Sequence, residues 1–363
     1  SVAVNWRTTT LVQFPQVQYA AASDWTEFTE VVNVIDAKSE QVTLDKERIV
    51  YHHSAVIDNL NARTMYIYRV GGKGIWSEWS QFQTASNDSN DFTFVWFGDV
   101  QHGLNDYVPR IFRRAFQQAP DARFWLFTGD MVDLAQRDSQ WNDLIAASGF
   151  TSSVIPWMAA AGNHEYPDTV INEVEVSYLD PSFKNHFTFP ENGISGLKES
   201  SYYFDYQNVR FIVLNGNEQL SDQALWLDSI LSNNPCRWTI AVLHQPLYSM
   251  GKKRDQRKTR EAFLSVFDKY KVDLVLQGHD HVYSRSYKLF NGKKVSPEGH
   301  GTVYVTSMSG SDSYPLNYLY NDLMEKNGAN LQLFQVISID GRKLSFSAYT
   351  PAGTLYDDFN LYK

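Results

Sequence analysis

The chain has 363 residues, a formal net charge of -9 and an isoelectric point near 5.5. This acidic balance disfavours a nucleic-acid binder, whose phosphate contacts need a basic face, and leaves nucleotides only as small substrates. No stretch approaches the roughly 20 apolar residues of a membrane span, and the single Cys236 allows no internal disulfide. The length suffices for a small and a large domain, each with a core.

The first part of the chain predicts an all-β domain. Residues 1–85 alternate polar and apolar side chains in short runs with turn residues between them, as an antiparallel sandwich requires. Residues 86–91 are small and polar, which indicates a linker. We therefore expect two domains, residues 1–85 and residues 92–363.

The second part predicts a layered α/β domain. Strand patterns alternate there with helical patterns at residues 107–118, 221–232 and 258–269. The tail, residues 331–362, returns to strand character, and we expect it to close one of two sheets in this domain.

Five short motifs each follow a hydrophobic strand pattern in this second part. A Gly-Asp pair alone is usually a turn, and a lone histidine is usually a core residue. Five in this order share no such explanation, because side chains at the carboxyl ends of successive strands converge on one crevice. The motifs are Gly98-Asp99, Gly129-Asp130, Gly162-Asn163-His164-Glu165, His244 and Gly278-His279-Asp280-His281.

These residue types are the ligands that a pair of adjacent metal ions needs. Two divalent ions a few ångströms apart repel each other, so they require a bridging carboxylate and a bridging hydroxide. Carboxylate, amide and imidazole ligands suit zinc, iron or manganese, as like or mixed pairs. Such a site carries a charge of about +1, which attracts a phosphate ester. We expect Asp130 as the bridge, Asp99 and His281 on one ion, and Asn163, His244 and His279 on the other.

The order and spacing of the motifs resemble the calcineurin-like metallophosphoesterases and, within them, the purple acid phosphatases. The resemblance covers nearly the whole chain. It implies an α/β four-layer sandwich of two mixed β-sheets flanked by helices, preceded by a small fibronectin-III-like β-sandwich. The segments that carry it are residues 1–8, 51–55, 66–71, 76–78, 244–248 and 278–285.

The sequence departs from that family pattern at the first metal. In the purple enzymes a tyrosine stands three residues after the bridging aspartate, and its phenolate helps to hold a ferric ion; here the residue is Asp133. In the broader superfamily the first motif reads Asp-x-His, but here Gln101 has that place and His102 follows it. Gln101 through its amide oxygen, His102 after a backbone turn, or water alone could complete the first site, and Gln101 or His102 could instead bind the substrate. Losing a phenolate weakens the preference for a trivalent ion.

The remaining polar residues of the motifs have expected supporting roles. His164 is placed to hydrogen-bond a phosphoryl oxygen or to protonate the leaving group. Glu165 would orient an imidazole or a loop, or would simply be a carboxylate in the first turn of a helix. Asp133 and Asp280 are expected to form hydrogen bonds that hold the metal-binding side chains in place, without binding a metal themselves.

These features predict metal-dependent hydrolysis of phosphate esters, with a broad, acid phosphatase-like phosphomonoesterase as the preferred interpretation. A phosphodiesterase or nucleotide pyrophosphohydrolase would use the same metals, and an inactive binding protein that uses the β-sandwich is a third alternative. The segment 166–203 is expected to form part of the wall that decides between substrates. The basic run 252–260 is either a solvated helix entrance or a loop that steers anionic substrates.

Location and assembly are less determined by the sequence. The first residue already reads as strand and aromatic residues make up 15% of the chain, which is typical of exported β-rich proteins. We therefore expect a secreted or periplasmic protein with a signal peptide removed before residue 1. The sequence makes no prediction of the oligomeric state.

Overall fold

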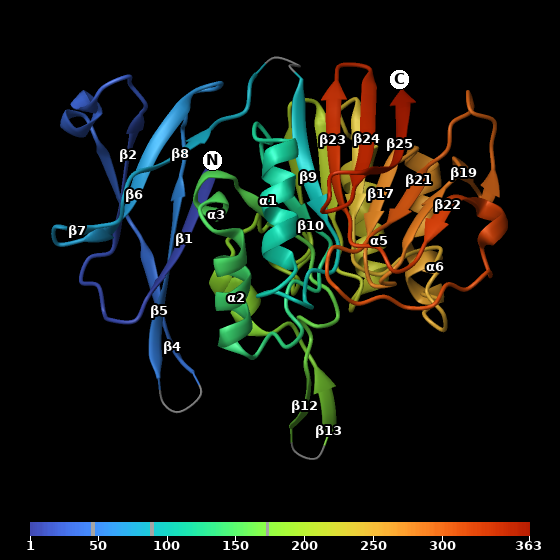
Figure 1. Cartoon of the computed structure of the whole chain (residues 1–363), viewed down its shortest axis with the longest axis horizontal. Helices are drawn as coiled ribbons and strands as arrows, with labels where there is room; N and C mark the ends of the chain where they lie inside the picture. Colours follow the sequence, from blue (N-terminus) through green and yellow to red (C-terminus); the bar gives the residue numbers. More distant parts are fainter. Residues whose placement is uncertain (45–47, 88–90, 172–173) are drawn as a thin grey trace.

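The computed structural model describes residues 1–44, 48–87, 91–171 and 174–363. An all-β region and a larger α/β region lie side by side along the longest axis of the molecule (Figure 1). The expected linker at residues 86–91 lies partly outside the described residues, and the domain boundaries stay a prediction.

The N-terminal region consists of two antiparallel sheets. One has the order β1 (Val2–Thr8), β5 (Ile49–Ile57), β4 (Lys38–Thr43). The other has the order β3 (Asn33–Asp36), β2 (Gln16–Ala21), β6 (Met65–Gly72), β7 (Ile75–Trp76), and β8 (Ser80–Gln83) also pairs with β6. Their inward side chains form one core, which includes Val4, Val17, Ile57, Tyr66 and Phe82. The all-β prediction is confirmed, while the more specific likeness to fibronectin type III stays a prediction.

The α/β region contains two large mixed sheets. The six-stranded sheet has the order β11 (Trp157–Ala159), β10 (Trp125–Phe127), β9 (Phe92–Phe97), β23 (Phe334–Asp340), β24 (Lys343–Tyr349), β25 (Leu355–Tyr362). The tail of the chain therefore closes this sheet, as expected. The seven-stranded sheet has the order β14 (Tyr202–Tyr206), β15 (Val209–Val213), β16 (Trp238–Val242), β17 (Leu274–Gln277), β21 (Val303–Thr306), β18 (Tyr283–Ser286), β22 (Met324–Gly328).

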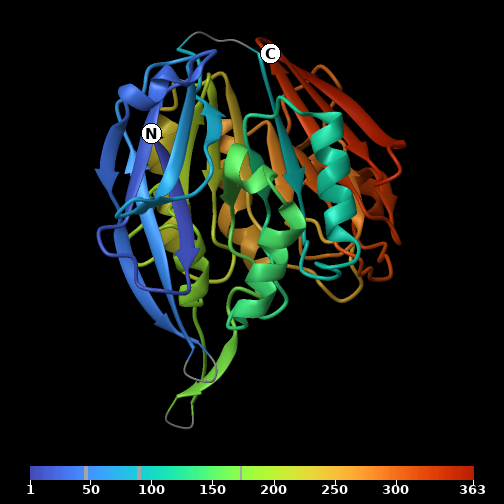
Figure 2. The same ribbon diagram turned by 60° about the vertical axis from the view of Figure 1, so that its left-hand side comes forward.

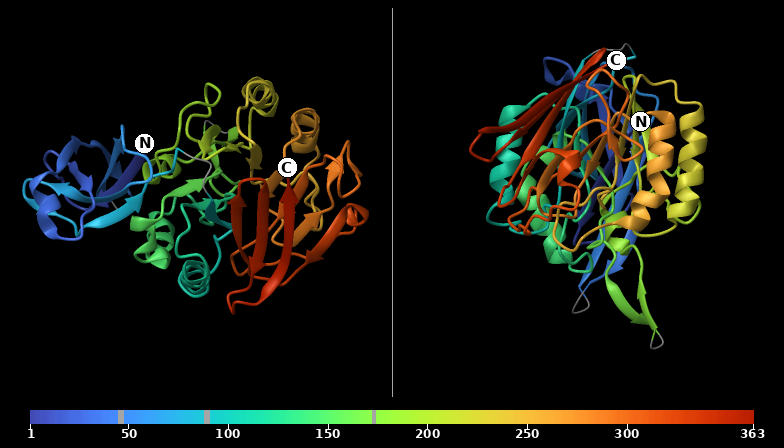
Figure 3. Two further views of the ribbon diagram at one scale, coloured as in Figure 1. Left: turned by 90° about the horizontal axis from the view of Figure 1, so that it is seen from above. Right: turned by 90° about the vertical axis from the view of Figure 1, so that its right-hand side faces the viewer.

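Helices cover the outer faces of both sheets (Figure 3). On one side lie α1 (Val108–Gln118) and α2 (Asp138–Ser148), and on the other lie α5 (Leu220–Ser232) and α6 (Arg257–Tyr270). The four-layer prediction is confirmed, and α1, α5 and α6 fall where the sequence predicted helices. The smaller elements are α3 (Thr151–Val154), α4 (Pro181–His186), the 3-10 turns η1 (Thr26–Glu30) and η3 (Asn321–Leu323), and the hairpins β12 (Asp168–Ile171)–β13 (Val174–Ser177) and β19 (Leu289–Phe290)–β20 (Lys293–Lys294).

Strand β15 shows how the layers hold together. Successive side chains of a strand point to opposite faces. Phe211 packs between the two sheets, with its ring 5.2 Å from that of Phe94 in β9. The next residue, Ile212, belongs instead to the core beneath α5 and α6, with Leu227 and Phe263. Both faces of this strand are buried, which explains its unbroken apolar sequence.

The two regions make direct polar contacts. The guanidinium of Arg7 in β1 is bonded to Asp138 in α2. The hydroxyl of Tyr68 in β6 donates to the carbonyl oxygen of Ser153 at 2.7 Å.

The β12–β13 hairpin extends away from the body of the molecule (Figure 2). Every helix among the described residues is too short or too polar to cross a bilayer.

Candidate metal centre

The parallel strands of both sheets bring the predicted ligands to one place. Strands β9, β10 and β11 run parallel, as do β16 and β17. Parallel neighbours end at the same edge of a sheet, where their loops converge. Asp99, Asp130 and Asn163 follow the first three strands, and His244, His279 and His281 follow the other two.

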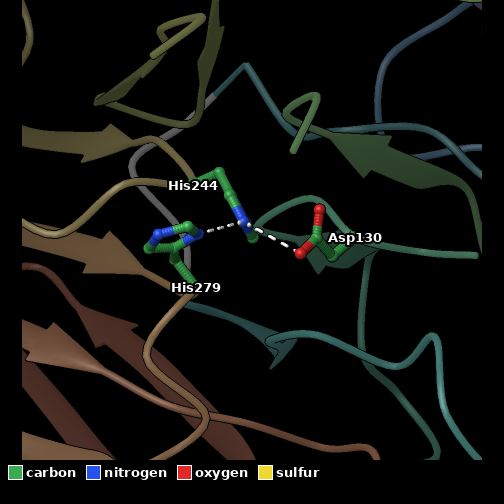
Figure 4. A group of neighbouring side chains, drawn as sticks. All are labelled: Asp130, His244 and His279. Atoms are coloured by element: carbon green, nitrogen blue, oxygen red, sulfur yellow. Dashed lines mark hydrogen bonds and ion pairs between the residues drawn. The ribbon is translucent and has the colours of Figure 1, made fainter. Parts of the chain in front are cut away.

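Two groups of potential ligands overlap at a single carboxylate. Asp130, His244 and His279 form one group, and Asp99, Asp130 and His281 form the other. Within each group the ligand atoms lie within 4.8 Å of one another. Figure 4 shows the side chains of the first group pointing toward one another. Asp130, which is fully buried, is therefore in the position that a bridging ligand requires.

The amide oxygen of Asn163 lies beside the histidines of the first group. Its Oδ1 lies 2.8 Å from Nδ1 of His279 and 3.1 Å from Nε2 of His244. The other ring nitrogen of His244, Nδ1, donates to the carbonyl oxygen of Thr128 at 2.7 Å. This bond fixes the ring so that Nε2 faces the group, which is how metal-binding histidines are oriented.

The charges of this group are strongly coupled. Burial disfavours a charged His244, but the carboxylates of Asp130 and Asp99 outweigh it and raise the pKa of His244 to about 9. Burial also disfavours a charged Asp130, but His244 and His164 lower its pKa below the ordinary value. The pKa of His279 is lowered by burial and by the charges of His244 and Arg254. The site therefore holds a buried carboxylate that needs cationic neighbours.

The ligand loops have unusual backbone conformations and pack tightly. Asp99, Asp130, His279 and His281 have φ angles of 32°, 49°, 71° and 49°, in the left-handed region that non-glycine residues rarely adopt. A Cβ atom on Gly162 would lie 2.1 Å from Oδ1 of Asp130, so only glycine allows this approach. The glycines in these motifs let one ligand loop touch the carboxylate of the next.

Glu165 joins two of the ligand loops. Its carboxylate is buried and accepts hydrogen bonds from the backbone N–H groups of Asp130 at 2.8 Å, Met131 at 2.9 Å and Gly162 at 2.7 Å. Burial and the charge of Asp130 raise its pKa to about 7. Of the roles weighed for Glu165, these contacts correspond to orienting a loop.

His164 lies at the rim of the site with its side chain 30% exposed. Its Nδ1 donates to the backbone oxygen of Asp133 at 2.7 Å, and its backbone N–H donates to Asp130 Oδ1 at 2.9 Å. Its Nε2 is 3.9 Å from Asp130 Oδ2 and faces the ligand groups. A protonated ring could therefore donate from Nε2 to a group bound there.

Asp133 and Asp280 contact residues outside the two ligand groups. Asp133 supports His164, with its Oδ1 3.4 Å from Nδ1 of that ring. Asp280 accepts hydrogen bonds from the backbone N–H groups of Met250 at 2.6 Å and Gly251 at 2.8 Å. It stands between two ligand histidines in sequence, but its side chain turns away from them and holds a neighbouring loop.

The structure separates the two candidates for completing the first site. Gln101 is buried, with Nε2 3.5 Å from Nε2 of His281, and its Oε1 has no hydrogen-bond partner among the described residues. His102 is partly exposed, and its Nε2 lies 3.1 Å from Oδ2 of Asp312. Gln101 is therefore the closer neighbour of the ligand groups, and His102 lies at their edge.

Three residues near the ligands were not predicted as site residues. Nη2 of Arg254 lies 3.2 Å from Nδ1 of His279, and Nε2 of Gln256 lies 3.0 Å from its Nε2. The ring of Tyr314 lies 4.7 Å from that of His281. The basic run 252–260 was a signal for Arg254, whereas Gln256 and Tyr314 belong to no recognisable motif.

A cleft of about 270 Å³ adjoins the centre. Tyr166 contributes to its wall, but its hydroxyl donates to Glu218 at 2.6 Å and accepts from Asn215 at 2.6 Å. The expected wall segment 166–203 is thus partly present, although residues 172 and 173 lie outside the described part. The lining consists of Asn163, Tyr166, Asp168, Ser177, Asn217 and Glu218.

Two parts of the chain match the patterns of known protein families. The pattern of the family described as calcineurin-like phosphoesterase matches residues 92–283. The chain belongs to the calcineurin-like phosphoesterase family. Residues 1–84 match the N-terminal domain of purple acid phosphatases, so this phosphoesterase is of the purple acid phosphatase type. This family binds metal ions, and its name describes phosphoester hydrolysis.

Individual relatives agree with this assignment. An uncharacterized protein of Mycobacterium tuberculosis is 27% identical over 372 residues, covering 88% of this chain and 68% of that protein. Purple acid phosphatase 21 of Arabidopsis thaliana is 28% identical, covering 72% of this chain and 58% of that protein. The solved purple acid phosphatase of yellow lupin (Lupinus luteus) seeds is similar in fold, with a TM-score of 0.79, 19% identity, and coverage of 99% of this chain and 72% of that one.

Proposed function

We propose that this phosphoesterase hydrolyses phosphate monoesters with two metal ions held by Asp99, Asp130, Asn163, His244, His279 and His281. The observation that carries the proposal is the pair of ligand groups that share the carboxylate of Asp130. A shared carboxylate is what two adjacent cations require, because it screens their mutual repulsion.

The donor atoms fit such ions. They are carboxylate, amide and imidazole groups, a mixture that suits zinc, manganese or iron. Oε1 of Gln101 is buried and without a hydrogen-bond partner among the described residues, and the buried Oδ2 of Asp130 lies 3.1 Å from Nε2 of His244, an atom that could bind the same ion, which supports a cationic occupant. Two such ions, when bound, would supply a hydroxide nucleophile at neutral pH and neutralise charge on the phosphoryl oxygens.

The chain's own residues would do the remaining chemistry. His164, protonated and held by the backbone oxygen of Asp133, would give its Nε2 proton to the leaving alcohol. Glu165 would keep the loops of Asp130 and Gly162 at a fixed separation through its three hydrogen bonds. Catalysis of phosphoryl transfer depends mainly on such positioning and on charge.

We further propose that both ions are divalent. Asp133 replaces the tyrosine that the family resemblance would place on the first ion. The hydroxyls of Tyr166 and Tyr283 are bonded to Glu218 and Asp357, which leaves neither as a substitute phenolate. One relative, from Arabidopsis thaliana, is named an Fe(3+)-Zn(2+) purple acid phosphatase; it is 26% identical, and the match covers 89% of this chain and 71% of that protein.

Elemental analysis combined with two substrates tests the proposal. We expect about two metal ions per chain and faster hydrolysis of a phenyl monoester than of the diester of the same phenol. Adding zinc or manganese to metal-stripped protein should restore activity without an oxidant. A faster rate on the diester would favour the phosphodiesterase alternative, and no rate with both ions bound would favour the binding protein.

A further inference from the structure

Arg254 places a positive charge at the rim of the ligand groups. It precedes α6, and its Nη2 lies 3.2 Å from Nδ1 of His279. Its guanidinium carbon is 4.6 Å from the centre of the Tyr314 ring, within the range of a cation–π contact. The same ring lies 4.7 Å from the imidazole of His281. Arg254 thus contacts a ligand of one group directly and reaches a ligand of the other group through one aromatic ring.

Arg254 interacts with the buried carboxylate of Asp280 only at a distance. Nearby arginines are paired: Arg257 with Glu261 at 2.7 Å, and Arg260 with Asp255 at 2.7 Å. In the part of the chain that the structure describes, Arg254 forms no ion pair, and its buried Nε has no hydrogen-bond partner. A guanidinium in this state beside a phosphoesterase site has unused donors that an anion can occupy.

The segment that carries Arg254 is fixed to the ligand loop. The carboxylate of Asp280 accepts hydrogen bonds from Ser249 Oγ at 2.9 Å, Met250 N at 2.6 Å and Gly251 N at 2.8 Å. Because Asp280 lies between two ligand histidines in the chain, these bonds set the position of the arginine segment relative to the ligands. A cation positioned before the substrate arrives contributes its full interaction to binding.

We infer that Arg254 binds the non-bridging oxygens of the substrate phosphoryl group and gives the site its preference for monoesters over diesters. This inference rests on the proposed function of the site. A guanidinium fork pairs with two oxygens at once. A monoester offers three non-bridging oxygens and a charge of roughly −2, whereas a diester offers two and roughly −1. A fixed cation therefore favours the monoester.

The test compares Arg254→Gln with the matched control Arg257→Gln, which removes the same charge from an exposed position on α6. In Arg254→Gln, kcat/KM for the phenyl monoester should fall about 10- to 100-fold, while that for the diester falls less than about 3-fold. Arg257→Gln should change neither. Metal content should stay at the wild-type value in both variants. Equal losses on the two substrates would overturn the inference.

Two further variants separate charge from geometry. Arg254→Lys keeps the charge but loses the fork, so monoester kcat/KM should be intermediate between wild type and Arg254→Gln. Tyr314→Leu removes the ring and should raise KM for the monoester, and Tyr314→Phe, which keeps a ring, should bring KM back toward the wild-type value. A Tyr314→Leu variant with wild-type KM and wild-type metal content would contradict the positioning role of the ring.

Binding of inorganic phosphate tests whether Arg254 contacts the phosphoryl oxygens, even if the protein does not catalyse hydrolysis. With both ions bound, the Arg254→Gln variant should bind phosphate about 10-fold more weakly than the wild type in a calorimetric titration. If the wild type proves inactive, the proposed function fails, but this titration still tests Arg254. Unchanged phosphate affinity in Arg254→Gln would overturn the inference whatever the activity of the wild type.

Discussion

Two clusters of histidines in the described part of the chain differ in what surrounds them, and one of them is the candidate metal site. In the ligand groups, His244, His279 and His281 face carboxylate and amide oxygens. At the contact between the two regions, His52 of β5 and His186 of α4 lie with their ring centres 4.9 Å apart. His52 is as buried as His279, so low exposure alone does not mark a ligand.

The neighbours of each cluster make the difference. The Nδ1 atoms of His52 and His186 donate to the backbone oxygens of Asn185 at 3.0 Å and Ser182 at 2.7 Å, and the ring of His186 stacks on Trp141 at 4.7 Å. Burial lowers the pKa of His186 to about 4, because its hydrogen bond does not compensate the lost hydration. Beside two carboxylates, in contrast, the pKa of His244 rises to about 9. A histidine becomes a ligand through the charges it faces, whereas this pair is a neutral structural contact.

The largest expected effect comes from removing the charge that the two ligand groups share. Asp130→Asn lowers the negative charge between the two ions, so we expect it to reduce both metal content and turnover by orders of magnitude. Elemental analysis and rates on the same preparation measure this. Two bound ions with a near-normal rate would refute the binuclear assignment.

His164→Ala should have the next largest effect and should leave the ligands intact. The variant is expected to lose about 10²- to 10⁴-fold in kcat, since it removes a proton donor, and to keep both ions. The loss should shrink for an ester whose leaving group needs no proton. Metal lost in proportion to rate would make His164 a ligand instead.

The contact between His52 and His186 predicts that the unfolding free energy depends on pH. His186 has a folded pKa of about 4 against an ordinary value of 6.5. The unfolded chain therefore binds more protons than the folded chain between these pH values. The contribution of His186 to the unfolding free energy is thus fully present above about pH 6.5 and is lost as the pH falls toward 4. The loss attributable to His186 is about 3 kcal/mol at most.

Denaturant unfolding at pH 7.5 and pH 4.5 measures this dependence. His186→Phe keeps a ring against Trp141 but cannot take up a proton, so its unfolding free energy should fall less on acidification than that of the wild type. The exposed His300 provides the control, and His300→Gln should retain the wild-type dependence. Equal pH dependence in His186→Phe and the wild type would show that the pair does not titrate in this range.

The smallest expected effect is spectroscopic. With Asp133 in place of tyrosine, the protein should show no tyrosinate charge-transfer band whatever metals it holds. Asp133→Tyr loaded with iron should gain such a band. A visible band in the wild type would mean that another tyrosine reaches the first ion, and Tyr314, whose ring contacts His281, would be the first to replace.

The sequence predicted the parts of the molecule that depend on strand order. Asp99, Asp130 and His244 could be expected together because each follows an apolar strand, and the carboxyl ends of parallel strands meet. The same alternation of strands and helices predicted a layered α/β domain, and the family resemblance implied that it has four layers.

The sequence could not predict contacts between loops. Asp280 and Met250 are 30 residues apart, and the approach of Arg254 to Tyr314 depends on how two irregular segments pack. The periodicity of apolar residues in a sequence does not predict how irregular segments pack against each other. Likewise, whether Gln101 or His102 lies nearer the ligand groups depends on the direction in which one turn leaves the strand.

The left-handed backbone at Asp99, Asp130, His279 and His281 has a consequence for the history of such a chain. Each non-glycine residue in this conformation costs about 1 kcal/mol, roughly 4 kcal/mol for the four if they add, against a typical net stability of about 5–15 kcal/mol. Glycine at any of these positions would relieve the strain while removing one of the proposed ligands. If the proposed site is what selection preserves, a lineage released from that selection would drift toward a more stable protein without it, because these four side chains are held against the folding free energy.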